Sequence, residues 1–381
     1  MLALEISPEL AELRSALRRF TSERLEPLAE RIDRDGEVPD EALRLLREHG
    51  YLGMRLPAEF GGGGFDLATY CLAMEEFARS HRVFTLLLDG TSGLTPIAIA
   101  RFGSAAQKHK YVAGLATGTI SASFALTEPH AGSDAAAIRT RATRTADGWT
   151  LSGRKHYISG AHRADLILVV ALTDPLKRAR GGISAFLVDR GTAGLEVTRI
   201  DSTIGSEAIK LAELTFENCF VPDSCLLGEI GDGFKVAMSS LASGRLSVAC
   251  SCLGTADRLL EMSVGYAKSR ETFGRPLAER QAIQWMLADS AAELASARAL
   301  VYEVLRRANA GIATDTDAGR AKLVASERVG RVADRAVQIH GGMGLVRGYP
   351  VERFYRDVRH YRVGEGASEI QRMLIARDLL R

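Results

Sequence analysis

Cysteine is scarce in this sequence, and no cysteine stands in a metal-binding pattern. The 381 residues include five cysteines, an odd number with no CxxC pair and no Cys/His cluster at metal-ligand spacing. Two of them lie two residues apart in an expected helix, where they face different sides and suit neither a bridge nor a shared metal. We therefore expect reduced thiols packed in a core and no metal site. The five are Cys71, Cys219, Cys225, Cys250 and Cys252.

Excess charge of one sign and long apolar runs are lacking too. The sequence has 49 Lys and Arg against 47 Asp and Glu, a net charge of +2, so its charge does not favour a nucleic acid partner. The longest apolar run, LILVVAL at 166–172, is far shorter than the ~20 residues that cross a bilayer. The opening MLALEISPEL has no basic-then-apolar leader. We expect a soluble, cytoplasmic protein that does not enter a membrane.

The usual glycine-rich phosphate loops are nearly absent. GGMGLVRG at 341–348 has Arg347 where GxGxxG needs its last glycine, and it follows an expected helix rather than a strand. No GxxxxGKS or GxxxxGKT segment occurs either. A dinucleotide would therefore have to be held without a Rossmann or P-loop site.

The first third of the chain has the pattern of helices. Ser7 followed by Pro8 predicts a helix start, since serine caps helices and proline suits the first helical position. Leu10, Leu13 and Leu17 then recur at helical spacing. Further helices are expected at about 39–49, 66–80, 85–102 and 104–116. These segments predict an all-helical N-terminal domain over residues 1–122.

Between about 120 and 228 the apolar period changes from 3.6 to 2. Short β-rich runs are separated by turn signals such as Asp147-Gly148 and are not interleaved with helices. A doubly wound parallel sheet is therefore disfavoured, and an antiparallel β-barrel or sandwich domain is expected over residues 123–228. The runs are TISASFAL, GWTLSGRKHYIS, DLILVVALT, ISAFLVD, LEVTRI and LAELTFENCFV.

Long helices return in the last part of the chain. They are expected at roughly 233–269, 277–310, 315–340 and 368–380. An apolar stripe that includes Leu294, Val301 and Leu305 is typical of a bundle core. The fold class is therefore α+β, with the helical and β domains followed by a C-terminal four-helix-bundle domain over residues 229–381.

Three motifs in this order give the sequence a family resemblance. ALTEPHAGSDAAA spans 125–137, RETFG spans 270–274 before Gln281, and QIHGGMGLVRGYPVERFYRD spans 338–357. Together they make nearly the whole chain resemble the acyl-CoA dehydrogenase family of flavoproteins. One position departs, since Gly348 stands where the family usually has an acid.

The resemblance gives Glu365, in YRVGEGASEIQR, a role. In most of the family a Glu in such a segment removes the proton α to a thioester carbonyl, and its backbone N–H helps polarise that carbonyl. Gly364 and Gly366 let the backbone pass close to the substrate, and burial would raise the pKa of the carboxyl. A minority of the family carry the base just before an Arg on the first long helix of the last domain. Here that position is Gly244, before Arg245, so no rival carboxylate stands there.

The resemblance also implies FAD as the cofactor. Tyr157 stands where the family commonly has a Trp packed against the flavin, and it keeps an aromatic face. The positions that would contact the flavin or its pyrophosphate are Phe124, Leu126, Thr127, Gly132, Ser133, Tyr157, Ser159 and Ser368. Those through which one subunit would reach the FAD of its neighbour are Arg270, Thr272, Phe273, Gln281, Gln338, Gly341 and Gly342. A homotetramer, or a dimer, is the expected assembly.

Ser133, Arg245 and Gly366 resemble positions that seat the substrate. Asp89, in TLLLDGTSG, follows an apolar run in the part of the chain that lines the family's acyl pocket. A helix-end or loop carboxylate is its default interpretation, and a contact to a polar group on the substrate is the alternative. The family often has Tyr and Thr at the positions of Gly364 and Ala367. Their absence here would widen the pocket for a branched, cyclic or bulky acyl group.

The expected activity is FAD-dependent α,β-dehydrogenation of an acyl-CoA to the trans-2-enoyl-CoA, as in fatty acid β-oxidation. An electron-transferring flavoprotein is the expected electron acceptor. The same chemistry on an acyl group tethered to a carrier protein is an alternative, as is a flavin-dependent oxidase or monooxygenase of the same fold. Glu365 argues against the oxygen-using enzymes, and its retention together with Arg270 argues against a scaffold without catalysis.

Overall fold

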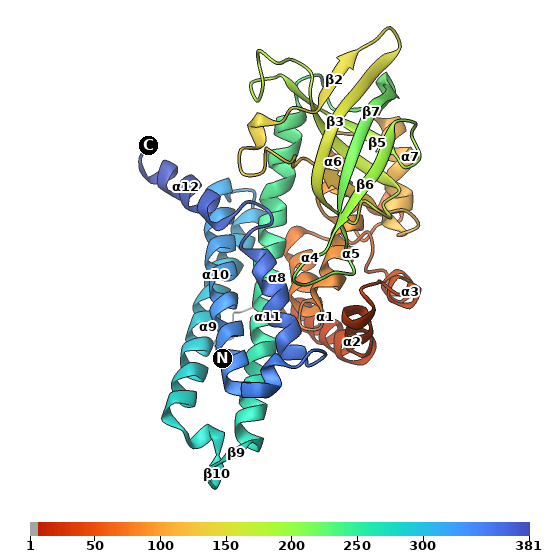
Figure 1. Ribbon diagram of the computed structural model, residues 1–381. Helices are drawn as coiled ribbons and strands as arrows, with labels where there is room; N and C mark the ends of the chain where they lie inside the picture. Colours follow the sequence, from red (N-terminus) through yellow and green to blue (C-terminus); the bar gives the residue numbers. More distant parts are fainter. Residues whose placement is uncertain (1–6) are drawn as a thin grey trace.

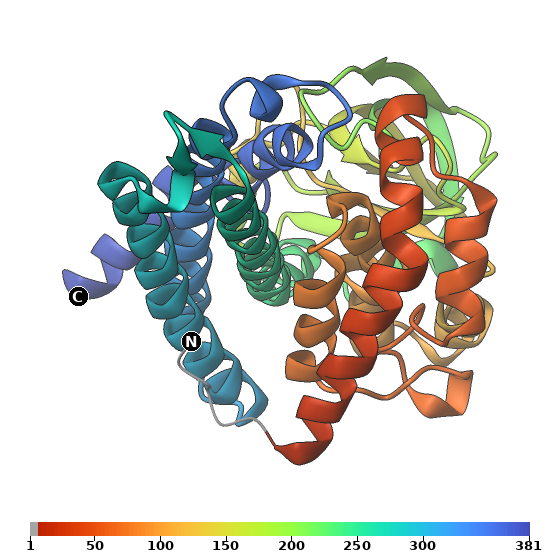
Figure 2. The ribbon, with the colours of Figure 1, turned by 90° about the horizontal axis from the view of Figure 1, so that it is seen from below.

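The computed structural model describes residues 7–381, so part of the opening segment on which the leader expectation rests lies outside it. The chain forms three lobes that meet along one long helix, α8 (Gly233–Ser269). Figure 1 shows the sheet beside the start of α8 and the C-terminal helices along the rest of it. Seen from below, α8 lies between the N-terminal helices and the C-terminal helices (Figure 2).

Helices make up the N-terminal lobe, as predicted. The Ser7 side chain accepts a hydrogen bond from the backbone N–H of Leu10 at the first helix start, also as predicted. The predicted single helix over 85–102 is wrong, because the chain leaves helical geometry at Gly93. The helices are α1 (Pro8–Phe20), α2 (Glu26–Asp35), α3 (Asp40–Glu48), α4 (Leu67–Phe77), α5 (Arg82–Ser92), α6 (Leu94–Phe102) and α7 (Ala105–Ala116).

One eight-stranded sheet forms the middle lobe, in the order β6-β7-β3-β2-β4-β5-β8, with β1 also paired to β4. Most pairs are antiparallel, as expected, but β1 and β2 run parallel to β4, which the sequence analysis did not foresee. Every residue of β4 is buried, which explains its unbroken apolar run. The strands are β1 (Ala122–Ala125), β2 (Arg141–Arg144), β3 (Gly148–Ser159), β4 (Leu166–Leu172), β5 (Ile183–Asp189), β6 (Leu195–Asp201), β7 (Leu211–Pro222) and β8 (Leu226–Leu227).

The C-terminal lobe is helical and carries a short hairpin, β9 (Glu271–Thr272) and β10 (Arg275–Pro276). This hairpin lies at the end of the lobe farthest from the sheet (Figure 1). Besides α8 the helices are α9 (Gln281–Asn309), α10 (Asp315–His340), α11 (Pro350–Tyr361) and α12 (Ser368–Leu379). The sequence analysis missed α11, although its buried residues Val351, Phe354, Val358 and Tyr361 have helical spacing.

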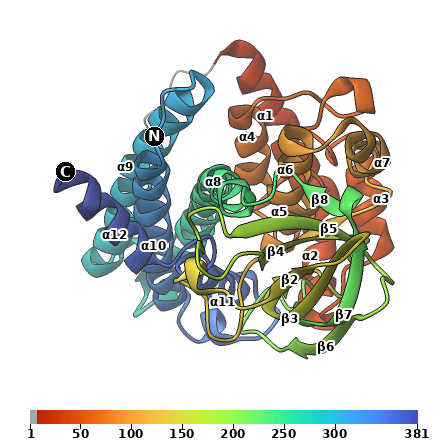
Figure 3. The same cartoon turned by 90° about the horizontal axis from the view of Figure 1, so that it is seen from above.

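The N-terminal helices and the C-terminal bundle share a single hydrophobic core. Leu17 and Phe77 from the first lobe pack in one cluster with Leu253, Val301 and Val332 from the last. A second cluster lies between the sheet and helices α6 and α7, and a third lies on the other face of the sheet. Figure 3 shows the sheet on one side of α8 and helices α9 and α10 on the other. Helix α8 therefore has neighbours on most of its sides.

Two helical stretches are long and apolar enough to cross a bilayer by length and composition alone. They are Arg82–Phe102, which takes in α5 and α6, and Gly233–Ser269, which is α8. In both, 67% of the apolar window is buried inside the protein. This burial is what a core helix of a folded domain shows, so these stretches are weak evidence for a membrane span.

Gly254 sets how closely α8 approaches α4. A Cβ at Gly254 would lie 1.8 Å from the backbone oxygen of Glu75, which is closer than any real contact. We predict that Gly254→Ala lowers the free energy of unfolding by about 1–3 kcal/mol or more, because the helices must move apart.

Gly265, on the same helix, is the matched control. It has no atom within 4 Å of an added Cβ, so Gly265→Ala should be neutral or gain up to about 1 kcal/mol from helix propensity. Urea unfolding of both variants measures the difference. Equal stability of the two would contradict the close approach of the helices.

Candidate active site

The loop between α11 and α12 holds Glu365 in a strained backbone conformation. Glu365 has φ 56° and Gly366 has φ 89°, and such a positive φ is uncommon for a residue other than glycine. Two fully buried side chains hold the loop, Lys322 from α10 and Gln371 from α12. Lys322 Nζ and Gln371 Nε2 both donate to the Gly366 carbonyl, at 2.8 and 2.9 Å. The loop is thus fixed before any ligand arrives.

The carboxyl of Glu365 has no partner among the described residues. Its Oε2 atom is buried and makes no hydrogen bond, although the residue as a whole is only partly buried. Burial raises the pKa of Glu365 to about 8, and the negative charge of Asp89 adds to this effect. The nearby cations Arg245, Lys322 and Arg82 act in the opposite direction. Glu365 is therefore a much stronger base than an ordinary glutamate.

Gly244 on α8 lies directly against this carboxyl. A Cβ at Gly244 would lie 2.7 Å from Glu365 Oε2 and 2.9 Å from a methyl carbon of Leu94. The two positions that the resemblance offered for a base therefore meet at one place in space. The absence of a side chain at Gly244 leaves the room that the Glu365 carboxyl occupies.

A second acidic residue, Asp89 on α5, lies near Glu365. Burial raises the pKa of Asp89 to about 6, while Arg55 and the Tyr70 hydroxyl favour its ionised form. Tyr70 is 1% exposed and Asp89 is partly exposed. Asp89 lies in the last turn of α5, where the helix-end interpretation puts it, and its contact to a polar group on the substrate stays a prediction. The sequence analysis missed Arg55 and Tyr70.

The middle-lobe residues predicted to contact a flavin lie on an exposed surface. Tyr157 is 55% exposed and stacks on His156, with ring centroids 3.8 Å apart. Ser159 and Ser133 are exposed and Thr127 is partly exposed. The hydroxyls of these three residues make no hydrogen bond to another described residue, so they are free to bind a ligand.

A buried ion pair supports this surface from beneath. Lys155 Nζ donates to Glu128 Oε1 at 2.8 Å and to the Leu126 carbonyl at 2.9 Å. The Glu128 carboxylate also accepts from the backbone N–H groups of Arg139 and Thr140. Burial lowers the pKa of Lys155 to about 8, while Glu128 favours its charged form. The Glu of the ALTEPHAGSD motif therefore positions the segment that follows β1.

Two predicted flavin contacts have their side chains engaged within the chain. Ser368 is buried and donates to Glu327 Oε1 at 2.6 Å, and its backbone N–H donates to the Arg362 carbonyl. Phe124 is partly buried and packs against the core between the sheet and the N-terminal helices. Gly132 is exposed with open space beside it.

The other predicted cofactor residues lie at the opposite end of α8. Arg270 follows the last residue of this helix, whose first residue, Gly233, packs on Ser184 of β5. At 1.5 Å per residue, the 37 residues of α8 separate the two ends by about 55 Å. The Tyr266 and His340 rings lie 4.4 Å apart, which places Gln338, Gly341 and Gly342 at the same end as Arg270. Thr272, Phe273 and Gln281 belong to this group too.

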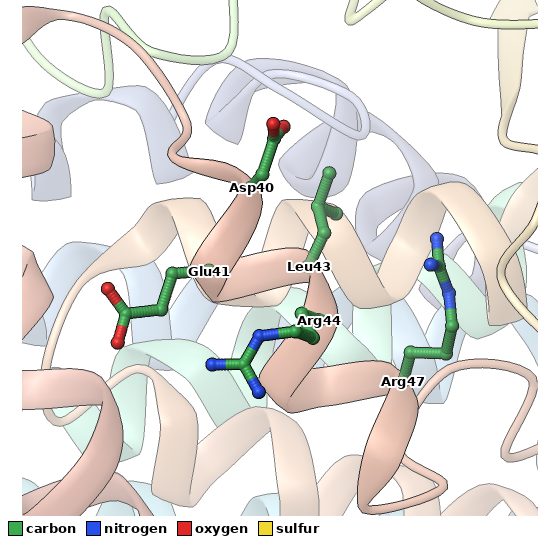
Figure 4. A pocket seen from close by; sticks show the side chains of 5 residues that line it. All are labelled: Asp40, Glu41, Leu43, Arg44 and Arg47. Atoms are coloured by element: carbon green, nitrogen blue, oxygen red, sulfur yellow. The ribbon is translucent and has the colours of Figure 1, made fainter.

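The hollow in Figure 4 is a different feature of the surface. All five side chains that line it, Asp40, Glu41, Leu43, Arg44 and Arg47, come from the single helix α3. A surface built from one helix offers no convergent set of groups for catalysis. It is separate from the Glu365 cluster.

Comparison with known protein families matches all three lobes. The chain matches the N-terminal, middle and C-terminal domains of acyl-CoA dehydrogenase over residues 7–119, 123–219 and 231–380. The chain belongs to the acyl-CoA dehydrogenase family. It is therefore an FAD-dependent oxidoreductase.

Similar proteins cover the chain from end to end. An acyl-CoA dehydrogenase of Bacillus subtilis (strain 168) is 38% identical over 377 residues, 99% of each chain. The structure of butyryl-CoA dehydrogenase from Megasphaera elsdenii matches at a TM-score of 0.95 and 36% identity over 100% of both chains. A prolyl acyl carrier protein oxidase, AnaB, matches at a TM-score of 0.94 and 29% identity over 98% of this chain and 100% of its own.

The donor set of the chain fits FAD. The exposed ring of Tyr157 offers a stacking face, and the free hydroxyls of Thr127 and Ser159 lie on the same exposed surface. Arg270 is exposed and forms no salt bridge with a described residue, so it can neutralise a phosphate. Gly341 has open space beside it, which lets a ligand come close to the backbone, although its own N–H donates to the Gln338 carbonyl.

Lys322 and Gln371, which hold the Glu365 loop, are residues that the sequence analysis missed. A lysine and a glutamine on helices normally face solvent, so their type alone suggests no role. The signal that could have found Lys322 is its helical spacing from the apolar residues Ala318, Ala325 and Val329 of α10.

Proposed function

We propose that this acyl-CoA dehydrogenase family member removes the α-proton and the β-hydride from an acyl-CoA thioester, giving the trans-2-enoyl-CoA. The observation that carries the proposal is the buried, unpartnered carboxyl of Glu365, with its pKa raised to about 8. A structural glutamate in a core would have a hydrogen-bonding or charged partner. A general base needs a carboxylate oxygen with no other hydrogen-bond partner, so that this oxygen can take up the proton.

In this proposal, the ionised Glu365 carboxylate accepts the α-proton while the α-carbon electrons form the new double bond. The bound FAD would supply the acceptor for the β-hydride. At pH 7 a group with a pKa near 8 is about one-tenth ionised, and Arg245, Lys322 and Arg82 favour that ionised form. The backbone N–H of Glu365 donates to no described residue and is free to polarise the thioester carbonyl.

Arg245 is proposed to help seat the CoA part of the substrate. It is 6% exposed, its Nε has no hydrogen-bond partner, and burial lowers its pKa. A buried guanidinium with a free donor suits a carbonyl or phosphate oxygen. Ser133 and Gly366 remain substrate contacts that the resemblance proposes.

The carrier-protein alternative is supported by one similar structure, the prolyl acyl carrier protein oxidase. The α,β chemistry proposed for Glu365 would be the same on a thioester held by a carrier. An electron-transferring flavoprotein is the proposed electron acceptor.

We further propose that FAD binds between subunits, because the two groups of cofactor residues lie at opposite ends of α8. Large exposed apolar side chains at the Arg270 end, Phe273 at 97% and Trp285 at 61% exposed, support a subunit contact there. A homotetramer is the assembly that we propose.

Arg270→Ala tests this arrangement. We expect it to lower the FAD content of the purified protein severalfold, because one phosphate loses its cation. Lys268→Ala, two residues away and also exposed, is the matched control and should keep its FAD. Absorbance and mass measurement report cofactor content and assembly together. Full FAD content in Arg270→Ala would contradict the proposal.

An anaerobic titration with acyl-CoAs tests the proposed reaction. In the wild type, we expect a substrate to bleach the absorbance of oxidised FAD. In Glu365→Gln the rate of bleaching should fall by a factor of about 10²–10⁴, because the general base is lost.

Glu41→Gln, an exposed carboxyl on α3, is the control and should bleach at the wild-type rate. Bleaching by carrier-bound acyl groups alone would favour the carrier alternative. Unchanged bleaching in Glu365→Gln would remove Glu365 from the mechanism.

A further inference from the structure

A polar group of residues stands next to the base, where a plain hydrocarbon chain would call for apolar neighbours. Asp89 on α5, Tyr70 on α4 and Arg55 before α4 form this group, which we call the polar pocket end. The inference rests on the proposed function, and it concerns which acyl group that site takes.

Contacts through glycine positions connect Asp89 to the base. A Cβ at Gly93 would lie 1.8 Å from Asp89 Oδ1, so the glycine makes room for that carboxylate. The next residue, Leu94, packs over Gly244, and the Glu365 carboxyl packs over the same glycine. The Asp89 and Glu365 carboxyls are therefore connected by contacts through Gly93, Leu94 and Gly244, and the charge of Asp89 acts on Glu365.

Arg55 lies beside the same contacts, but it forms no salt bridge with Asp89. Its guanidinium lies 5.4 Å from the centre of the Tyr70 ring and donates to Ser243 Oγ at 3.5 Å, beside Gly244. Asp89 forms no salt bridge with any described residue. A structural ion pair would join the two groups directly, so this arrangement leaves capacity for a third group.

The Tyr70 hydroxyl is the second group with hydrogen-bonding capacity left over, because it interacts with Asp89 as a donor and its oxygen has no donor among the described residues. Tyr70 is 1% exposed, yet its hydroxyl makes no hydrogen bond of good geometry with a described residue. It is close enough to Asp89 to affect the charge of that carboxyl. A ligand that donates to this buried oxygen would satisfy the capacity that the protein leaves unused.

We propose that the polar pocket end recognises a neutral hydrogen-bonding substituent on the acyl chain of the substrate, a hydroxyl group being the simplest case. A hydroxyl can donate to the Asp89 carboxylate and accept from Tyr70 or Arg55. It thereby satisfies both kinds of partner in the group.

Charged substituents fit this group less well. A substrate carboxylate would pair with Arg55 but would face Asp89, and Glu365 close by, at short range. A substrate ammonium would pair with Asp89 but would face Arg55 and Arg82. A plain alkyl end would leave the remaining hydrogen-bonding capacity of Asp89 and Tyr70 unsatisfied. The mixed donors and acceptors therefore select a neutral polar group.

A matched substrate panel tests the inference. Pentanoyl-CoA, 5-hydroxypentanoyl-CoA, glutaryl-CoA and 5-aminopentanoyl-CoA share a five-carbon chain and differ at its end. Plain and hydroxylated four- and six-carbon acyl-CoAs vary the distance between the thioester and the end of the chain. We expect kcat/KM for a hydroxylated member to exceed that of its plain partner by about tenfold or more, as one satisfied hydrogen bond supplies.

Substitutions assign the preference to residues. Asp89→Leu should abolish the hydroxyl preference, and Asp89→Asn, which keeps a hydrogen-bonding oxygen, should retain part of it. Glu41→Gln again serves as the control for removal of a carboxylate elsewhere. A higher kcat/KM of the wild type for the plain, carboxylate or ammonium substrate than for the hydroxylated one would overturn the inference. This comparison needs only the wild type, so it holds even where a variant does not fold.

Binding of unreactive analogues separates this inference from the proposed reaction. Alkyl-CoA thioethers, with and without a terminal hydroxyl, cannot be dehydrogenated through a thioester, and calorimetry gives their Kd without turnover. Tighter binding of the hydroxylated thioether with no flavin bleaching by any acyl-CoA would sustain the polar pocket end and defeat the proposed reaction. Bleaching by acyl-CoAs with equal Kd values for the two thioethers would do the reverse.

Discussion

The burial of one carboxyl without a partner is the constraint on which the site depends. Desolvation gives Glu365 a pKa near 8. Burying this carboxyl is unfavourable, so other contacts must hold the loop in place. Lys322 and Gln371 supply these contacts, since both donate buried hydrogen bonds to the Gly366 carbonyl. The strained backbone at Glu365 persists because these two contacts determine the path of the loop.

Helix α8 connects this constraint to the rest of the molecule. Gly244 receives the Glu365 carboxyl, and Gly254, further along the same helix, admits the backbone of α4. A side chain at either glycine would displace its neighbour, so the packing of the N-terminal helices and the position of Glu365 both depend on α8. Because the helical lobes share a core, motion of one lobe would change the distance between Glu365 and Asp89.

Local patterns predicted much of this arrangement, and their failures have physical causes. The bounds of α8 and α10 and the position of Glu365 follow from helical periodicity and from a short motif. The parallel pairing of β1 with β4 depends on chain crossing, which period-two alternation does not encode. Arg55 and Tyr70 join the site only through tertiary packing, since a loop arginine and a helix tyrosine give no local signal. Gly93 is a possible helix break that can be read from the sequence, but the apolar pattern on both sides of it favoured a single helix over 85–102.

The charge state of Glu365 is the most direct test of this account. Infrared difference spectra between the wild type and Glu365→Gln, recorded from pH 6 to pH 10, report that single carboxyl. The account predicts a protonated carboxyl band at pH 6 that gives way to carboxylate bands with a midpoint near pH 8. A carboxyl already ionised at pH 6 would contradict it, because burial would then not be setting the strength of the base.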